Sequence, residues 1–173
     1  MKVVITGAGG QLGRELQRTA PAGARVTALG RGQLDITDAA AVERVIGGSQ
    51  PDLVINAAAY TAVDLAEQQP EMAFEVNARG AGNVAAAAAR VNARLIHIST
   101  DYIFDGHASI PYAADAVPAP LGVYGHSKLQ GEREVLAAAG DLALILRTSW
   151  LYAAHGRNFL RTMLGLMQSR DEI

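Results

Sequence analysis

Five short, nearly continuous apolar segments recur along the 173-residue chain, separated by longer segments that are compatible with helices. The apolar segments are 2–6, 25–29, 52–57, 94–99 and 142–148. Strands that alternate with helices are typical of βαβ units on a parallel sheet, and strands without apolar–polar alternation are usually covered on both faces. Because such connections are right-handed, we expect an α/β fold with a doubly wound parallel sheet, similar to a Rossmann fold.

The segments between the expected strands carry helix signals. Helices are predicted over 11–19, 39–46, 70–91 and 127–139, with Thr37-Asp38 as an N-cap region and Pro70 at a helix start. The segment 104–122 contains two glycines and three prolines, and we expect a long functional loop there.

The end of the sequence suggests an unfinished second portion. An amphipathic helix is predicted over 158–169, and no strand follows it. We therefore expect a dinucleotide-binding domain over 1–150 and the incomplete start of a substrate-binding portion over 151–173.

Composition excludes several classes of protein. Fifteen Lys and Arg stand against seventeen Asp and Glu, and the signs are interspersed, so no basic face is offered to nucleic acid or to an anionic membrane. The absence of cysteine excludes disulfides, thiolate catalysis and Cys-bound metal sites. No apolar segment approaches the roughly 20 residues that cross a bilayer, and the start is unlike a signal peptide, so we expect a cytoplasmic protein.

A glycine-rich turn, Gly-Ala-Gly-Gly-Gln-Leu-Gly, directly follows the first expected strand. Its G-x-x-G-x-x-G spacing is a variant of the dinucleotide-binding fingerprint. Gly7 would allow the tight turn, Gly10 the approach of a pyrophosphate and Gly13 close packing of helix on strand. A purely structural turn is the alternative, because 18 of the 173 residues are glycine. The cofactor-binding residues predicted from this turn are Gly7, Gly9, Gly10, Gln11, Leu12 and Gly13.

The residues after the second expected strand bear on the choice of cofactor. An acid there would bind a ribose 2′-hydroxyl, whereas an arginine would suit a 2′-phosphate. This chain has Arg31, and its first acid is Asp35. The pattern favours NADP over NAD, with an ordinary solvated arginine as the alternative.

Tyr124 and Lys128 stand four residues apart at the start of an expected helix, so their side chains share a face. A nearby lysine lowers the pKa of a phenol, as a tyrosine that transfers a proton near neutral pH requires. The chain has only one other lysine, Lys2, so a chance pair is uncommon; a surface Tyr–Lys contact is the alternative. Thr100 ends the fourth strand, where its hydroxyl could donate to a carbonyl oxygen or simply cap the strand.

Four segments carry a family resemblance: 56–64 (NAAAYTAVD), 99–106 (STDYIFDG), 120–128 (PLGVYGHSK) and 147–150 (RTSW). Together with the glycine turn, they resemble the extended short-chain dehydrogenase/reductases that act on nucleotide sugars, and within these the dTDP-4-dehydrorhamnose reductase family. Members of that family are longer and continue with a sugar-nucleotide-binding portion. We therefore expect the nucleotide site to be more complete than the substrate site.

The resemblance implies reduction of the C4 ketone of dTDP-4-dehydro-L-rhamnose to dTDP-L-rhamnose by NADPH or NADH. Tyr124 would protonate the C4 oxygen, Lys128 would lower the tyrosine pKa and hold the nicotinamide ribose, and Thr100 would bind the same oxygen. A homodimer and a magnesium requirement are implied by the resemblance alone, and no carboxylate cluster in the sequence identifies a metal site.

The same resemblance assigns further residues to the site. Asp35 and Ile36 would lie by the adenine, and Asn77 would be a supporting polar group. The cofactor backbone would be lined by Ala57, Ala58 and Ala59. The sugar nucleotide would be faced by Tyr102, Trp150 and Asn158, with core packing as the alternative for Trp150.

Two other functions remain open from the sequence. The resemblance extends to the regulatory β subunit of methionine adenosyltransferase, so a nucleotide-binding regulatory subunit is one alternative. An epimerase of the same superfamily, which would retain its cofactor, is the other. Dehydration is disfavoured, because related dehydratases have an acid where this chain has Tyr102.

Overall fold

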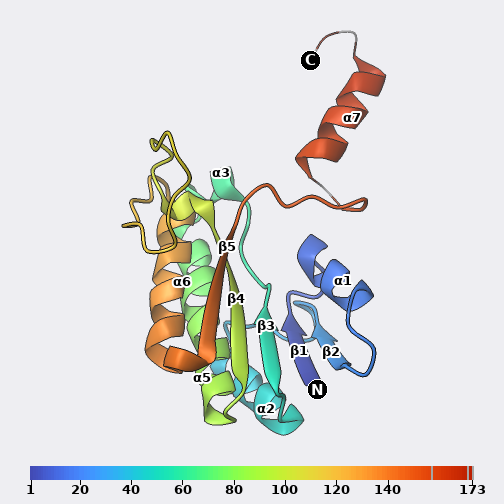
Figure 1. Ribbon diagram of the computed structural model, residues 1–173, viewed down its shortest axis with the longest axis vertical. Coiled ribbons are helices and arrows are strands. Elements are labelled where there is room, and N and C mark those ends of the chain that lie inside the picture. Colours follow the sequence, from blue (N-terminus) through green and yellow to red (C-terminus); the bar gives the residue numbers. More distant parts are fainter. Residues whose placement is uncertain (157, 171, 173) are drawn as a thin grey trace.

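The computed structural model describes residues 1–156, 158–170 and 172, and within them the chain forms a five-stranded parallel sheet (Figure 1). The strand order is β2-β1-β3-β4-β5. The strands are β1 (Lys2–Thr6), β2 (Arg25–Leu29), β3 (Leu53–Asn56), β4 (Arg94–Thr100) and β5 (Ala143–Thr148). The expected parallel α/β architecture is confirmed, and each strand lies within one or two residues of its predicted segment.

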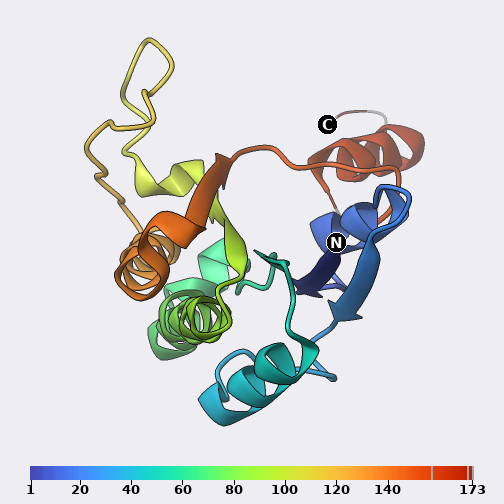
Figure 2. The same cartoon turned by 60° about the horizontal axis from the view of Figure 1, so that its bottom comes forward.

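Helices lie on both sides of this sheet, but unequally. Figure 2 shows α2 (Ala39–Ser49), α5 (Ala81–Arg90) and α6 (Val123–Ala139) together on one face and α1 (Gln11–Arg18) on the other. The remaining described helices are α3 (Val63–Ala66), α4 (Pro70–Phe74), η1 (Glu75–Gly80), η2 (Asp101–Ile103), η3 (Gly140–Leu142) and α7 (Phe159–Ser169).

Local signals set several helix boundaries as predicted. Asp38 Oδ1 accepts a 3.0 Å hydrogen bond from the backbone N–H of Ala41 and caps α2, and Pro70 occupies the first turn of α4. The predicted helix over 70–91 is a run of three segments, α4, a π-helical η1 and α5. The short α3 was not predicted.

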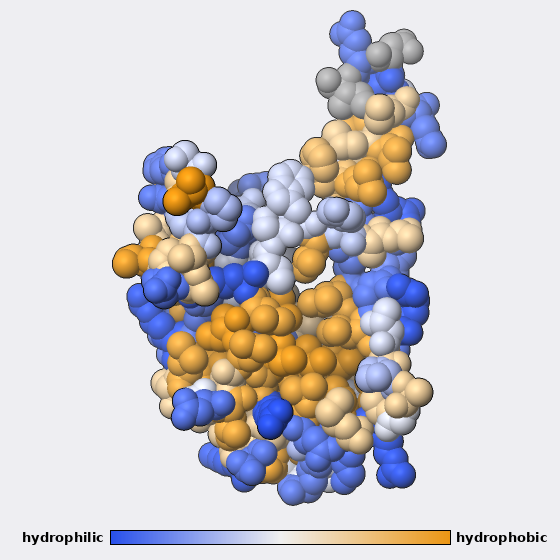
Figure 3. Space-filling view, viewed as in Figure 1, coloured by the Kyte–Doolittle hydropathy of each residue, from blue (hydrophilic) through white to orange (hydrophobic). Residues whose placement is uncertain are grey.

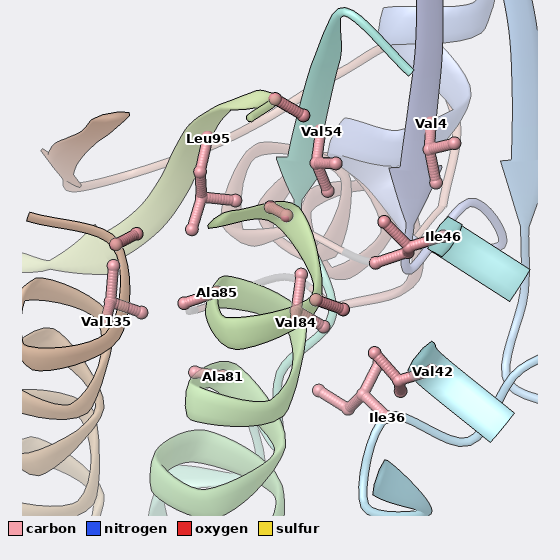
Figure 4. Packing of buried hydrophobic residues seen from close by; sticks show 14 of the residues in the cluster. Val4, Ile36, Val42, Ile46, Val54, Ala81, Val84, Ala85, Leu95 and Val135 are labelled. Carbon is pink, nitrogen blue, oxygen red and sulfur yellow. The ribbon is translucent and has the colours of Figure 1, made fainter. Parts of the chain in front are cut away.

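The main core lies between the sheet and the layer of α2, α5 and α6 (Figure 4). Val4, Val54 and Leu95 project from three neighbouring strands onto this layer. The facing side of α5 is built largely from alanines and includes the fully buried Ala85 and Val84. Small side chains let α5 pack closely on both neighbouring helices, since contact distance between helices depends on side-chain size.

The opposite face of the sheet is only partly covered. Leu144 and Leu146 alternate along β5 on that face and are 54% and 40% exposed, and Figure 3 shows a broad hydrophobic area over the strands. The expectation that both faces of every strand are covered is therefore wrong for β5 in the described residues. The continuous apolar pattern of β5 predicts that both of its faces are buried. The helix α1, on this face of the sheet, packs near β2 and does not cover β5.

The predicted loop is irregular throughout, from Phe104 to Gly122. It leaves the sheet after η2 and returns at the start of α6. None of the described helices combines the length and apolar character needed to span a membrane.

Candidate active site

A cavity of about 740 Å³ lies at the carboxyl ends of the strands, where ligands bind in open α/β sheets. Parallel register brings these ends to one edge, with Thr6 opposite Asn56 and Thr100 opposite Thr148. The predicted site residues that line the cavity are Gly7, Gly9, Gly10, Gln11, Leu12, Gly13, Arg31, Asp35, Ile36, Ala57, Ala58, Ala59, Thr100, Tyr102, Tyr124, Lys128 and Trp150. Residues distant in sequence thus meet in one pocket.

The glycine turn is packed too tightly for side chains at two of its positions. Gly7 has a φ of +71°, and a Cβ there would lie 2.5 Å from the carbonyl carbon of Ala57. A Cβ at Gly13 would lie 2.4 Å from the carbonyl oxygen of Gly7. Gly7 thus has the left-handed conformation expected in the turn, and Gly13 leaves no room for a side chain against Gly7 and Ala8.

The start of α1 has the features of an anion-binding site. Gly10 provides no side-chain cap, and the first turn contains no acidic residue. A Cβ at Gly9 would meet nothing within 4 Å, so the backbone there borders open space in the cavity. Free N–H groups and the positive end of the helix dipole favour a phosphate at such a terminus. These residues fit a bound dinucleotide.

Arg31 and Asp35 lie together beside this turn. Asp35 Oδ1 accepts from both the backbone N–H and the hydroxyl of Thr37, at 3.0 and 2.8 Å. The hydrogen bonds to Thr37, and to a smaller extent the charge of Arg31, lower the pKa of Asp35. Arg31 is exposed and lines the cavity, so its guanidinium can reach an anionic ligand.

Tyr124 and Thr100 both line the cavity, and Thr100 stands at the carboxyl end of β4. Tyr124 is in the first turn of α6 and is 9% exposed. Burial raises the pKa of Tyr124, and the polar side chain of Thr100 opposes that rise. Thr100 Oγ1 accepts from the backbone N–H of Tyr102 and donates to Asp101 Oδ1, both at 3.2 Å.

Lys128 is on the same buried face of α6, as predicted, and is 1% exposed. Its Nζ donates a 2.7 Å hydrogen bond to the carbonyl oxygen of Ile98. Burial lowers the pKa of Lys128 to about 8, and the charge of Glu132 acts in the opposite direction. The prediction that Lys128 lowers the pKa of Tyr124 is not met in this structure, because desolvation of the phenol dominates and raises it.

Close backbone contacts fix the position of α6. A Cβ at Gly131 would lie 2.1 Å from the carbonyl oxygen of Asn77, and one at Gly125 would lie 2.3 Å from that of Tyr102. Asn77 Nδ2 donates to Ser127 Oγ at 3.0 Å. The side chain of Asn77 also bonds both backbone groups of Tyr60. Asn77, predicted as a supporting polar group, thus joins η1 to α6 and to the loop after β3.

Two aromatic side chains stand exposed at the cavity. Tyr102 is 53% exposed and packs edge-on against Tyr124, with ring centroids 5.5 Å apart. Trp150 is 68% exposed, has a φ of +54° and contacts Phe159 edge-on at 5.1 Å. Within the described residues Trp150 is thus not packed into the core, and its left-handed backbone is a strained conformation of a kind that clusters at functional sites.

Asn158 has a different position from the other predicted residues. It caps α7 by accepting from the backbone N–H of Arg161 at 3.0 Å, and it donates to Gln11 Oε1 at 3.0 Å. It is not among the residues that line the cavity. Asn158 thus joins α7 to the first residue of α1.

Two polar contacts at the site were not predicted. Glu67 Oε1 accepts a 2.7 Å hydrogen bond from the backbone N–H of Val123 and caps the helix that carries Tyr124. Ser149 Oγ donates to Asp101 Oδ2 at 2.7 Å. Asp101 and Ser149 lie inside the segments that carry the family resemblance, and that position is the sequence signal for their contact. Glu67 is 56 residues from Val123, and no sequence signal indicates that they meet.

The magnesium implied by the resemblance finds no support in the described part of the chain. Across residues 1–156, 158–170 and 172, no group of three or more His, Asp or Glu side chains is arranged to hold a metal ion.

Comparisons with known proteins agree with this geometry. A dTDP-4-dehydrorhamnose reductase from Burkholderia thailandensis is 45% identical over 173 residues, which cover 100% of this chain and 58% of that protein. The solved structure of one from Clostridium acetobutylicum matches with a TM-score of 0.96 and 44% identity, covering 100% of this chain and 61% of that one. Another, from Bacillus anthracis in complex with NADP, matches with a TM-score of 0.96 and 42% identity over 99% of this chain and 61% of that one.

The chain therefore spans about three fifths of the length of these relatives. The family model described as the RmlD substrate binding domain matches residues 1–173. Full-length agreement with this model, together with the shared fold, shows that the chain belongs to the RmlD substrate binding domain family.

Proposed function

We propose that this chain is the nucleotide-binding and proton-donating part of an NADPH-dependent dTDP-4-dehydrorhamnose reductase. The observation that carries the proposal is the meeting of Tyr124, Thr100 and Lys128 in the cavity that the glycine turn also lines. The names of the relatives support the same activity. They favour a reductase over the regulatory-subunit and epimerase alternatives.

The proposed reaction converts the C4 ketone of dTDP-4-dehydro-L-rhamnose into the alcohol of dTDP-L-rhamnose. When bound, NADPH supplies the hydride that reduces the ketone carbon. The electron pair of the C=O bond moves to oxygen, and Tyr124 gives its phenolic proton to that oxygen. Thr100 is the hydrogen-bond donor to the same oxygen as negative charge develops there.

The electrostatics of the pocket suit a tyrosine that donates a proton. Burial raises the pKa of Tyr124, so the phenol holds its proton at neutral pH until the ketone oxygen becomes basic. Lys128 presents a buried ammonium group on the same face of α6 as this phenol. We also assign to Lys128 the binding of the nicotinamide ribose.

The proposed cofactor preference depends on Arg31. Its exposed guanidinium suits a 2′-phosphate, whereas Asp35 Oδ1 is engaged by Thr37. The NADP complex of the Bacillus anthracis relative supports this choice. NADH is the weaker donor in this proposal.

The remaining assignments concern the division of the chain. We propose that residues 1–150 bind the dinucleotide and that 151–173 begin the portion that binds the sugar nucleotide; residues 157, 171 and 173 are outside the described part of the chain. Tyr102 and Trp150 are the aromatic surfaces offered to the dTDP-sugar, and Asn158 supports this side through Gln11. A cytoplasmic location and a homodimer stay predictions.

The test begins with the purified chain and NADPH. Trp150 is the only tryptophan and lines the cavity, so energy transfer from Trp150 to the bound nicotinamide reports binding directly. NADH is titrated in parallel, and dTDP-4-dehydrorhamnose is then added while NADPH absorbance is followed. Tighter binding of NADPH with oxidation supports the proposal. Binding of NADPH without its oxidation supports only the nucleotide-binding part of the proposal. If neither NADPH nor NADH binds, the whole proposal is contradicted.

A further inference from the structure

Glu132 is a buried carboxylate of α6 that the proposed reaction does not use. It is 3% exposed and lies one helical turn after Lys128. Its Oε1 accepts from Ser99 Oγ at 2.5 Å and from Arg147 Nε at 3.0 Å, and its Oε2 accepts from Arg147 Nη2 at 2.7 Å. The two bonds from Arg147 form a bidentate pair, the strongest common arrangement of these groups.

This cluster joins three elements directly beside the catalytic groups. Ser99 and Arg147 are register partners on the adjacent strands β4 and β5, and Glu132 bridges them from α6. Ser99 immediately precedes Thr100. One carboxylate therefore ties the strand that ends in Thr100 to the helix that carries Tyr124 and Lys128.

Arg147 extends the connection to the loop 104–122. Its Nη1 donates to the carbonyl oxygen of Ala114 at 2.8 Å, and its guanidinium lies 5.4 Å from the ring centroid of Phe104. Phe104 stacks on Tyr112 with centroids 4.3 Å apart. Tyr112 Oη donates to Asp105 Oδ1 at 2.7 Å. The loop that leads into α6 is thus anchored to β5 through Arg147.

The arrangement of the pair argues for a task beyond stability. Glu132 is buried and carries a desolvation cost, whereas the Arg147 side chain is 26% exposed, and partly exposed ion pairs contribute little to stability. The directional contacts of a bidentate pair, in contrast, define one arrangement of the groups that they join. Here those groups border Thr100 and Lys128.

We propose that Glu132 and Arg147 are positioning residues that hold α6 against β4 and against the loop 104–122, and so keep Tyr124 and Lys128 in place relative to Thr100. The proposal rests on the proposed function, since it concerns the geometry of the same site. Neither residue lines the cavity: Glu132 acts from α6 on Ser99 of β4, and Arg147 acts from β5 on Glu132 and on the loop 104–122.

Two sets of variants test this role. Glu132→Gln keeps the size of the side chain and removes its charge. Arg147→Met removes the guanidinium, and Arg147→Lys restores a charge without the fork. Glu43→Gln is the control, because Glu43 of α2 and Arg90 of α5 form an exposed ion pair, and neither residue lines the cavity.

The readouts are made on folded protein, with urea unfolding used to choose conditions in which each variant is native. For Glu132→Gln we expect the Kd for NADPH to rise about threefold and kcat to fall about tenfold, with KM for the dTDP-sugar within about twofold of wild type. A purely stabilising ion pair would move none of these in the folded molecules. Arg147→Lys should recover more than half of the loss seen in Arg147→Met, and Glu43→Gln should match wild type.

The outcomes separate this proposal from the proposed function. Wild-type chain that fails to bind NADPH overturns both. Wild-type chain that binds NADPH, together with native Glu132→Gln and Arg147→Met that bind and turn over like wild type, overturns the positioning role alone. If the wild-type chain binds NADPH but shows no turnover, the positioning role is judged from the Kd for NADPH of Glu132→Gln compared with that of wild type. If Glu132→Gln does not fold, the comparison of Arg147→Lys with Arg147→Met decides, and equal behaviour of these two overturns the role.

Discussion

Lys128 Nζ donates a 2.7 Å hydrogen bond to the carbonyl oxygen of Ile98, which ties the buried ammonium group of α6 to the backbone of β4. Ile98 lies two residues before Thr100, so this bond also fixes the separation between the lysine and the strand-end hydroxyl. The buried ammonium group of Lys128 is therefore oriented by the sheet itself. The contributions of Lys128 and of the Tyr124 phenol can both be measured.

Replacement of Tyr124 by Phe should abolish proton donation and leave cofactor binding almost unchanged. General acid catalysis contributes roughly 10²- to 10⁴-fold to rate, so we expect ketone reduction to fall by about that factor. The Kd for NADPH, from Trp150 energy transfer, should stay within about twofold of wild type. Tyr152→Phe, at a site 66% exposed, is the control. If Tyr124→Phe kept most of its turnover, the general-acid assignment would be wrong.

Stability should depend on pH through Lys128. Burial lowers its pKa from 10.5 to about 8, so between these values the unfolded chain binds more protons than the native one. The contribution of Lys128 to the free energy of unfolding therefore rises with pH across this window, by up to about 3 kcal/mol. Urea unfolding of wild type and Lys128→Met at several pH values should show a difference that grows in favour of wild type. Parallel curves for the two proteins would contradict the assignment.

The buried imidazole of His97 should make stability depend on pH in the acidic range. His97 is fully buried, and its pKa is lowered to about 3, first by burial and second by the charge of Lys128. Its Nδ1 lies 3.1 Å from Asn56 Nδ2, and because Asn56 Oδ1 already accepts from the hydroxyl of Thr6, the amide donates to Nδ1. The ring is thus neutral with its proton on Nε2, which has no hydrogen-bond partner among the described residues.

As pH falls from 6.5 towards 3, the unfolded chain takes up a proton that native His97 refuses, so stability is lost across this interval. We expect a loss of several kcal/mol in wild type and a much flatter dependence in His97→Gln. Acid unfolding followed by circular dichroism measures both. The exposed His126, changed to Gln, should leave the wild-type dependence intact, and an equally steep curve for His97→Gln would refute the role of this ring.

Replacement of Gly131 by Ala should destabilise the protein, because the new methyl group would lie 2.1 Å from the backbone oxygen of Asn77. A backbone contact of this kind is relieved only by moving α6, and we expect a cost of about 1–3 kcal/mol. At Gly47 of α2 nothing lies within 4 Å, so Gly47→Ala should instead stabilise by about 0.5–1 kcal/mol. Thermal unfolding of both variants gives the comparison, and equal signs would contradict it.

The strands and most helices could be predicted because their signals are local. Apolar runs mark the five strands, Asp38 and Pro70 mark helix starts, and the turn from Gly7 to Gly13 joins a strand to a helix with the expected geometry. Asn77 shows the limit. The π-helical segment around it, which turns the side chain towards Ser127, depends on packing against α6 and has no signature in the spacing of the residues.

Most of the predicted site residues line one cavity, but the direction of the Tyr124 pKa shift differs from the prediction. Tyr124, Lys128 and Thr100 meet in one cavity as the motif spacing indicated. The raised pKa of Tyr124 arises from desolvation, which depends on how much of the phenol the fold covers. The cap that Glu67 provides for Val123 links positions 56 residues apart, and such a contact follows only from the folded chain.

The backbone contacts at Gly125 and Gly131 also bear on how this fold can evolve. A methyl group added at either position would clash with a backbone oxygen. The helix between Tyr124 and Glu132 therefore has almost no freedom to slide or rotate. The loop 104–122 is less constrained at three positions: Ile110, Val117 and Leu121 are 74%, 86% and 73% exposed, so substitutions there should cost little stability.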